Sequence, residues 1–309
     1  MLERAKENIT TKEDAEKFEE LVKENMRMGI LLEPPSLKER GAGNLIELHV
    51  ADTKFSFRWC PAGTFMMGSP KEEESRNDDE TLHEVKLTHG FWILETEVTQ
   101  EMFVNVMKKM VPDLANPNPS WFTKENEVYR KSLRNRGIPD SRFIDTSQFP
   151  VECVTWKMAH DYCEGFNKFF KPREGEFRLP TEAEWEYACR AGNDGTYSVS
   201  HSSIYFDKWN EGLKAVRQEA LPNSWGIYDM PGSVYEWCSD WYGPYPKGVL
   251  TQDPKGPEHP KEQKRVLRGG CWAERDVKFS RSAARVSMLP EGANDATPNI
   301  VGFRFVYGK

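Results

Sequence analysis

The chain has 309 residues, 38% of them hydrophobic and 12% aromatic, and a formal net charge of −7 at pH 7. This composition is typical of a globular protein with a substantial core and excludes a disordered chain. The acidic balance, without a cluster of Lys and Arg, argues against a surface for nucleic acid, whose phosphates require concentrated positive charge.

The beginning of the chain, MLERAKENITTKEDAEKF, has the pattern of neither a signal peptide nor a membrane span. A run of about 18 apolar residues, which a transmembrane helix requires, is missing from the sequence. Contact with a membrane is therefore expected only through a leader or lipid anchor that this sequence lacks. Without such a leader, we expect a cytoplasmic protein.

Six cysteines are scattered through the sequence without CxxC spacing. They are Cys60, Cys153, Cys163, Cys189, Cys238 and Cys271. This spacing fits neither a zinc site nor the dense disulfide framework of a small secreted domain. We interpret most of them as small buried hydrophobic residues, and one or two disulfides remain an alternative.

Residues 11–28 have the pattern of an amphipathic helix, in which Lys and Glu face away from five apolar residues. The apolar face consists of Ala15, Phe18, Leu21, Val22 and Met26. The following EPPSLKERGAG ends any helix, because it contains two prolines and two glycines. We therefore predict an N-terminal helix and linker over residues 1–44 and one main domain over residues 45–309. The helix either docks on that domain or binds a partner.

The main domain begins with strand patterns. LIELHVADTKFSFRWC, residues 45–60, alternates apolar and polar residues and predicts a hairpin of two strands. PAGTFMMGSP, residues 61–70, predicts a turn and a further strand. The acidic KEEESRNDDETLHE, residues 71–84, is expected to be a solvated loop. A calcium loop is the alternative, although the residue order of an EF-hand is missing.

Three helices are predicted in the middle of the chain. FWILETEVTQEMFVNVMKK, residues 91–109, runs from a strand into a helix that Thr99 would cap. Residues 156–170 repeat apolar positions at steps of three and four. In RLPTEAEWEYACRAG, Thr181 and Glu184 have the spacing of a capping box, and Gly192 lies where the helix would end.

The C-terminal part contains short aromatic-rich strands and turns. RVLRGGCW, from residue 265, and GFRFVYG, from residue 302, are candidate strands that could pair across the segment between them. Few helices, many short strands and long loops together predict an irregular α+β domain.

Eight segments resemble, in order, the motifs of the formylglycine-generating enzyme, or sulfatase-modifying-factor, superfamily. They are PAGTFMMGS, EVTQEMF, PVECVTW, RLPTEAEWEYACRAG, NSWGIYDMPGSVYEW, RVLRGGCW, RSAAR and GFRF. The resemblance extends from about Phe57 to Phe305. It implies an irregular C-type-lectin-like, formylglycine-generating-enzyme-type α+β fold with little regular secondary structure.

The same resemblance allows the enzyme hypothesis to be assessed. Catalytic members of the family carry a pair of cysteines in the C-terminal segment, which hold copper and oxidise a substrate thiol. The segment from Trp272 to Arg285 contains no cysteine, and Cys271 beside it cannot supply a pair. We therefore predict no catalytic residue, no cofactor and no enzymatic activity.

An oxygen-dependent modifying enzyme with an atypical site, similar to the iron-dependent sulfoxide synthases of this superfamily, is the alternative. The sequence gives it little support, because the histidines are dispersed. They are His49, His83, His89, His160, His201 and His259.

Family members often bind structural calcium near the segment that matches DMPGSVYEW. Glu236 could be a ligand here, but Ser233 stands where the family usually has asparagine. No metal site is therefore predicted, and structural calcium remains an alternative.

The segment over residues 271–302 follows neither a strand nor a helix period, and it is not uniformly polar. Its side chains are therefore expected to be displayed and not packed. The candidate ligand-binding positions are Ala273, Glu274, Arg275, Asp276, Val277, Phe279, Ser280, Val286, Ser287, Met288, Leu289, Glu291, Asn294 and Asp295. The expected scaffold of this site consists of Arg268, Gly269, Gly270, Trp272, Arg281, Arg285 and Gly302.

This frame, RGG-W, RSA-R and GFR at the C-terminus, resembles the variable proteins of diversity-generating retroelements. In that group, adenine-directed mutagenesis randomises positions between the frame residues. The resemblance implies a non-enzymatic, receptor-like protein with a diversified C-terminal binding patch. Its expected partner is a protein or glycan on another cell or host surface. A monomer at a bacterial cell surface is expected.

Overall fold

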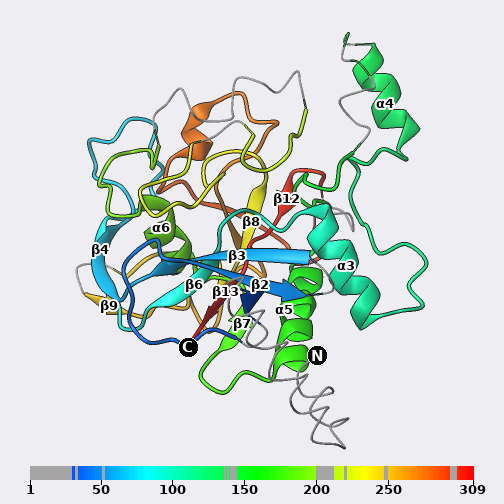
Figure 1. The fold of residues 1–309 in the computed structure, drawn as a ribbon. Coiled ribbons are helices and arrows are strands. Elements are labelled where there is room, and N and C mark those ends of the chain that lie inside the picture. Colours follow the sequence, from blue (N-terminus) through cyan, green and yellow to red (C-terminus); the bar gives the residue numbers. More distant parts are fainter. Residues whose placement is uncertain are drawn as a thin grey trace, which may run out of the picture.

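The computed structural model describes residues 30–31, 34–50, 53–135, 137, 139, 145–199, 212–218, 221–246, 250–292 and 298–309 (Figure 1). The helix predicted over residues 11–28 lies outside these ranges. Of the helices that are described, none is long and apolar enough to span a membrane.

The largest sheet of the described structure has six strands in the order β1-β2-β3-β6-β13-β7. These strands are β1 (Ile30–Leu31), β2 (Leu45–Val50), β3 (Thr53–Cys60), β6 (Phe91–Leu94), β13 (Val306–Gly308) and β7 (Glu176–Arg178). The predicted hairpin is confirmed, because β2 and β3 pair antiparallel from Leu45 opposite Arg58 to Val50 opposite Thr53. Strand β1 lies in the predicted linker region and pairs parallel with β2.

Two helices contact this sheet, α3 (Gln100–Met110) and α5 (Trp156–Phe170). The hydroxyls of Thr99 and Thr155 accept hydrogen bonds from the third backbone N–H that follows them, so both act as N-caps. The predicted helices are therefore confirmed. Between helices and sheet, the rings of Phe55, Phe166 and Phe305 lie within 4.9–6.2 Å of one another and form the centre of the core.

Helix α6 (Glu182–Arg190) begins with the predicted capping box. The backbone N–H of Glu184 donates to the Thr181 hydroxyl, and the Thr181 N–H donates to the Glu184 carboxylate. Every residue of α6 is buried. A buried helix with three glutamates needs cationic partners elsewhere in the chain.

Two smaller sheets complete the described strands. One has the order β4-β5-β9, with β4 (Gly63–Met67), β5 (His83–Leu87) and β9 (Thr251–Gln252). The other has the order β11-β10-β8-β12, with β11 (Val286–Met288), β10 (Arg265–Arg268), β8 (Tyr235–Trp241) and β12 (Val301–Gly302).

The pairing predicted between the two C-terminal strands is wrong. Strand β8 lies between β10 and β12, antiparallel to β10 and parallel to β12. The GFRFVYG segment also divides, because its last residues form β13 in the six-stranded sheet. In the sequence, two strands on either side of a long segment suggest a hairpin. In the structure, β8, which comes earlier in the chain, lies between β10 and β12 and pairs with both.

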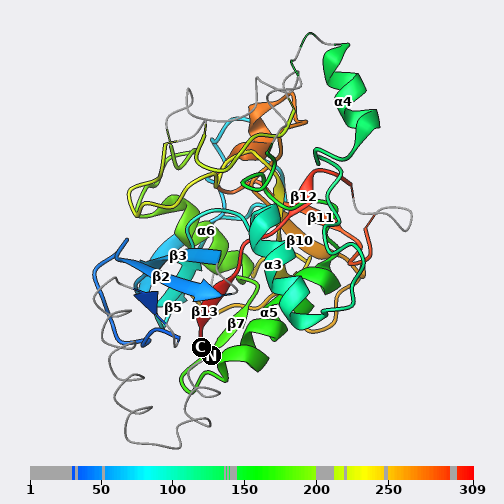
Figure 2. The same cartoon turned by 45° about the vertical axis from the view of Figure 1, so that its right-hand side comes forward.

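Part of the segment between β10 and β12 lies at the same end of the molecule as helix α4 (Glu127–Arg134). The 3₁₀ helix η4 (Val277–Ser280), drawn in orange, and α4 both lie at the upper end in Figures 1 and 2, and α4 projects beyond the neighbouring ribbon. The candidate positions in η4 and helix α4 therefore lie at the same end of the fold.

Candidate ligand-binding surface

Arg268, the last residue of β10, is fully buried and organises the segment that follows. Its guanidinium donates to the Glu186 carboxylate and to the carbonyls of Ser282, Ala283 and Ala284, at 2.5–3.0 Å. One buried cation therefore fixes the backbone of the RSAAR motif to helix α6.

Arg281 is also buried, and it joins the same segment to the acidic loop before β5. Its guanidinium donates to both oxygens of Glu80, at 2.6 and 2.7 Å, and to Glu73 at 2.7 Å. Burial opposes ionisation of Glu80, but the bonds from Arg281 and Ser69 hold its pKa below the usual value. The prediction that residues 71–84 form a solvated loop is therefore wrong for Glu73 and Glu80.

Arg285 completes the arginine frame. It forms a bidentate pair with Glu182 of α6, at 2.7 and 2.9 Å, and donates to the carbonyls of Asp79 and Gly243. Although burial acts in the opposite direction, Arg285 and Arg268 lower the pKa of Glu182. The charges of Arg268, Arg281 and Arg285 are thus balanced inside the fold.

Backbone conformation and close packing explain why three positions of the frame are glycine. Gly269 and Gly270 have φ angles of +98° and +79°, which favour glycine. A Cβ on Gly302 would lie 2.4 Å from the Val151 carbonyl oxygen, closer than atoms can approach.

Trp272 anchors the start of the candidate segment. Its backbone N–H donates to Ser233, its indole N–H donates to the Asn299 carbonyl at 3.1 Å, and its ring packs edge-on against Phe122. The indole therefore joins the two ends of the candidate segment.

Five of the candidate positions are exposed. They are Ala273, Arg275, Asp276, Leu289 and Glu291. Glu274 is half-buried, and its carboxylate accepts a hydrogen bond from the Tyr235 hydroxyl at 2.7 Å. We refer to these six residues as the C-terminal patch.

The remaining candidate positions within the described residues are less exposed than predicted. Val277 and Phe279 are half-buried in η4, and Ser280 is buried, so the prediction that Ser280 is displayed is wrong. Val286 and Met288 pack against the core from β11, and Ser287 lies between them in the same strand. A strand of three residues is too short for its alternation to be recognised in the sequence.

Asn294 and Asp295 lie outside the described residues. Their exposure stays a prediction.

The thiols do not have the properties of activated nucleophiles. Burial raises the pKa of the Cys271 thiol to about 12, and burial also raises the pKa of the other five cysteines. All six lack disulfide bonds. A reactive cysteine instead needs a lowered pKa and a positively charged environment.

Glu236, the residue that the sequence offers for calcium, does not fit that role in this chain. Arg304 donates to both of its oxygens, at 2.7 and 2.8 Å, and the Trp185 indole donates to one of them. Among the described residues, no group of three or more His, Cys, Asp or Glu could hold a metal ion. Arg304 thus supplies the positive charge beside Glu236.

Glu97 lies in the same charged cluster, but neither of its carboxylate oxygens has a hydrogen-bond partner, although the residue is fully buried. Burial, followed by the charge of Asp229, raises the pKa of Glu97 well above its usual value, against the effect of Arg304. The carboxyl group is therefore destabilised in its charged form.

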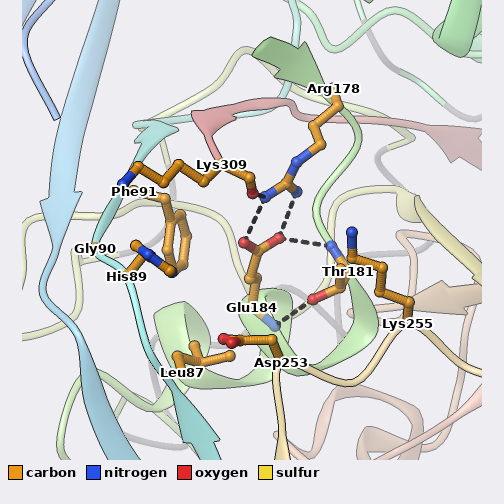
Figure 3. A pocket seen from close by; sticks show the side chains of 10 residues that line it. All are labelled: Leu87, His89, Gly90, Phe91, Arg178, Thr181, Glu184, Asp253, Lys255 and Lys309. Carbon is orange, nitrogen blue, oxygen red and sulfur yellow. Dashed lines mark hydrogen bonds and ion pairs between the residues drawn. The ribbon is translucent and has the colours of Figure 1, made fainter. Parts of the chain in front are cut away.

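The two cavities described in the fold lie away from the C-terminal patch. Figure 3 shows the first, of about 210 Å³, in which Arg178 donates to both oxygens of Glu184 beside Lys309. The second, of about 490 Å³, lies between the start of β3 and the loop before α3. Neither of these two cavities is lined by a residue of the patch.

Sequence reasoning missed the acidic partners of the arginine frame, Glu73, Glu80, Glu182 and Glu186. Their contacts with the arginines span between 82 and 208 residues of sequence, which no local pattern predicts. One sequence feature could have indicated Glu182 and Glu186: in α6, three glutamates alternate with Ala, Trp and Tyr.

Residues 51–309 match the family described as the sulfatase-modifying factor enzyme 1-like domain. The chain is 32% identical over 223 residues to the serine/threonine-protein kinase pkn1 of Chlamydia pneumoniae, covering 68% of this chain and 32% of that protein. It is 29% identical over 291 residues to the formylglycine-generating enzyme of Mus musculus, covering 79% of this chain and 73% of the enzyme. The chain thus spans about one third of the length of its chlamydial relative.

Two solved structures are similar over most of the chain. Treponema denticola variable protein 1 has a TM-score of 0.67 and 25% identity, covering 86% of this chain and 99% of that protein. PvdO from Pseudomonas aeruginosa also has a TM-score of 0.67, with 23% identity, covering 87% of this chain and all of PvdO. The predicted irregular C-type-lectin-like α+β fold is confirmed. Because the family match covers residues 51–309, the protein belongs to the family of sulfatase-modifying factor enzyme 1-like domains.

Proposed function

We propose that this protein is a non-enzymatic, receptor-like binding protein that presents the C-terminal patch to a ligand. One observation carries the proposal. The exposed side chains of Ala273, Arg275 and Asp276 lie between buried frame residues whose charges are already balanced. The proposal therefore predicts that substitution in the patch leaves the carboxylate pairs of Arg268, Arg281 and Arg285 intact.

The chemistry of the patch suits recognition better than catalysis. Arg275 and Asp276 carry opposite charges, Leu289 offers an exposed apolar side chain, and Glu274 is oriented by Tyr235. Such a mixture suits a specific contact with a protein or glycan ligand. The proposed ligand belongs to another cell or to a host surface.

The likeness to Treponema denticola variable protein 1 supports a diversity-generating retroelement as the origin of the patch. In this proposal, mutagenesis varies the exposed positions while the arginines and glycines of the frame stay constant. We further propose that the protein acts as a monomer at a bacterial cell surface, held there through a leader or lipid anchor outside this sequence.

The first test is sequencing of the 3′ end of the gene and its downstream DNA in many isolates. The proposal predicts a near-identical template repeat beside a reverse transcriptase gene. Substitutions should concentrate at template adenines in the codons of the C-terminal patch. An invariant segment without a template would refute diversification.

A second candidate function follows from relatives that are named formylglycine-generating enzyme. An oxygen-dependent modifying enzyme would oxidise a cysteine-containing peptide in the presence of copper(I) and oxygen. We expect no modified peptide by mass spectrometry, because Cys271 is the only thiol next to the segment in which the family resemblance places a catalytic pair. Turnover that is lost in Cys271→Ser would favour the enzyme.

A further inference from the structure

The loop and helix between α3 and α5 lie directly beside the C-terminal patch. The Phe122 ring contacts Trp272 edge-on, with ring centroids 5.1 Å apart, and Tyr129 of α4 packs against Phe122 at 4.5 Å. Phe122 and Tyr129 are buried. The aromatic row from Trp272 to Tyr129 therefore joins the base of the patch to the first turn of α4.

Hydrogen bonds fix this loop in place. The Phe122 N–H donates to the Glu152 carboxylate at 2.9 Å, and the Gln100 amide donates to the Phe122 carbonyl at 3.0 Å. Glu152 and Gln100 are buried. The backbone next to Trp121 is thus held through Phe122, while Trp121 itself is 43% exposed. An exposed tryptophan is a typical anchor of a protein interface.

One short segment connects Trp121 to the far end of the patch. Glu152 binds the loop at Phe122, and four residues later the Trp156 N–H donates to the Pro290 carbonyl at 2.9 Å. Pro290 follows Leu289, which is 45% exposed. Residues next to Trp121 and Leu289 therefore bind opposite ends of the same segment.

The charge of this region differs from that of the whole chain. Between Lys124 and Arg134 there are four basic and two acidic residues, a net charge of +2 in a chain of −7. They are Lys124, Glu125, Glu127, Arg130, Lys131 and Arg134. Val128 is 68% exposed on the same helix, which projects from the fold in both views (Figures 1 and 2).

We propose that Trp121 and α4 form a constant wall of the ligand-binding surface, and that the ligand is a protein with an acidic contact surface around an apolar centre. This inference rests on the proposed function. Basic residues on a projecting helix attract an acidic partner, and exposed Trp121, Val128 and Leu289 supply the apolar contacts. Apolar anchors on three separate segments fit the surface of a protein better than a single sugar ring.

A display library tests this inference without knowledge of the natural ligand. The exposed patch positions Ala273, Arg275, Asp276, Leu289 and Glu291 are randomised. Phage carrying the full chain are selected separately on ovalbumin, an acidic protein, and on lysozyme, a basic one. We expect more and tighter binders to ovalbumin.

Substitutions in the selected ovalbumin binders then test the wall itself. Trp121→Ala should raise the Kd by about tenfold or more. Lys131→Glu should lower the association rate constant several-fold at low salt. The matched controls are Phe169→Ala, an exposed aromatic residue in the last turn of α5, and Lys108→Glu, an exposed lysine of α3. Both controls should leave binding unchanged.

The outcomes separate the two proposals. Binders whose Kd is unchanged by Trp121→Ala, or that favour lysozyme, would refute the constant wall and leave the patch as a binding surface. A library that folds but yields no binder to either target would contradict the proposed function, and the wall with it.

Discussion

Glu80→Gln tests whether the frame is held by its buried charge pairs. Glu80 accepts two of the three carboxylate bonds that Arg281 makes, and both side chains are buried. Removing one partner of a buried ion pair costs about 3–5 kcal/mol, because the other charge stays buried. Glu73 still binds Arg281, and glutamine keeps one acceptor oxygen, so we expect a loss of about 3 kcal/mol in the free energy of unfolding.

Denaturant unfolding followed by tryptophan fluorescence measures this loss. Glu291→Gln is the matched control, since it makes the same chemical change at an exposed patch position and should shift the free energy of unfolding by less than about 0.5 kcal/mol. Equal, small effects for both substitutions would show that the Arg281 pair does not hold the frame. The distinction between a fixed frame and a replaceable patch would then fail.

Three further predictions concern other parts of the fold. Burial raises the pKa of Glu97 in the folded state, so stability should fall as pH rises above about 4.3, the ordinary value of a glutamate in an unfolded chain. Glu97→Gln cannot ionise, so it should be more stable than the parent protein at pH 7 and should flatten the pH profile measured by thermal unfolding. Gly302→Ala should destabilise the protein by about 3 kcal/mol or more, because the added Cβ would clash with the Val151 carbonyl oxygen. In the control Gly41→Ala, the added Cβ makes only ordinary contacts, so equal melting temperatures of the two variants would contradict this prediction. Cys271 should resist iodoacetamide at pH 8 until the protein unfolds, because its pKa lies near 12; rapid labelling by mass spectrometry would contradict its burial.

The sequence predicts elements whose signal is local. Helix α6 carries its capping box in four consecutive residues, and the β2–β3 hairpin carries its alternation in sixteen. The sequence predicts a strand at β10 and another over residues 302–308, where β13 lies, but it does not predict their pairing, because β8 pairs with β10 and β13 belongs to another sheet. Pairing between distant strands is decided by the whole sheet and leaves no trace in either strand alone.

In the candidate site, too, residues with a local signal could be predicted, and residues whose role depends on distant contacts could not. The arginines and glycines of the frame could be predicted because the resemblance to the family's motifs marks them. The lack of a period predicts the exposure of Ala273, Arg275 and Asp276, whereas the burial of Ser280 at the end of η4 and the short strand β11 were not predicted. The neighbouring wall at Trp121 lies about 150 residues earlier in the chain, and its placement beside the patch depends on the tertiary contact of Phe122 with Trp272.

The register of β8 gives the C-terminal segment an unusual pair of endpoints. Arg268 of β10 and Gly302 of β12 both lie opposite Glu236, on its two sides. With neighbouring strands about 4.8 Å apart, the segment leaves and returns at points separated by roughly 10 Å. The sheet therefore holds the two ends of this loop together, and the entropic cost of closing the loop does not depend on which residues the loop contains. Exchange of exposed side chains can change the ligand that the surface recognises without changing the position of the surface on the fold. An insertion or deletion in the segment, in contrast, would have to be accommodated between two fixed ends.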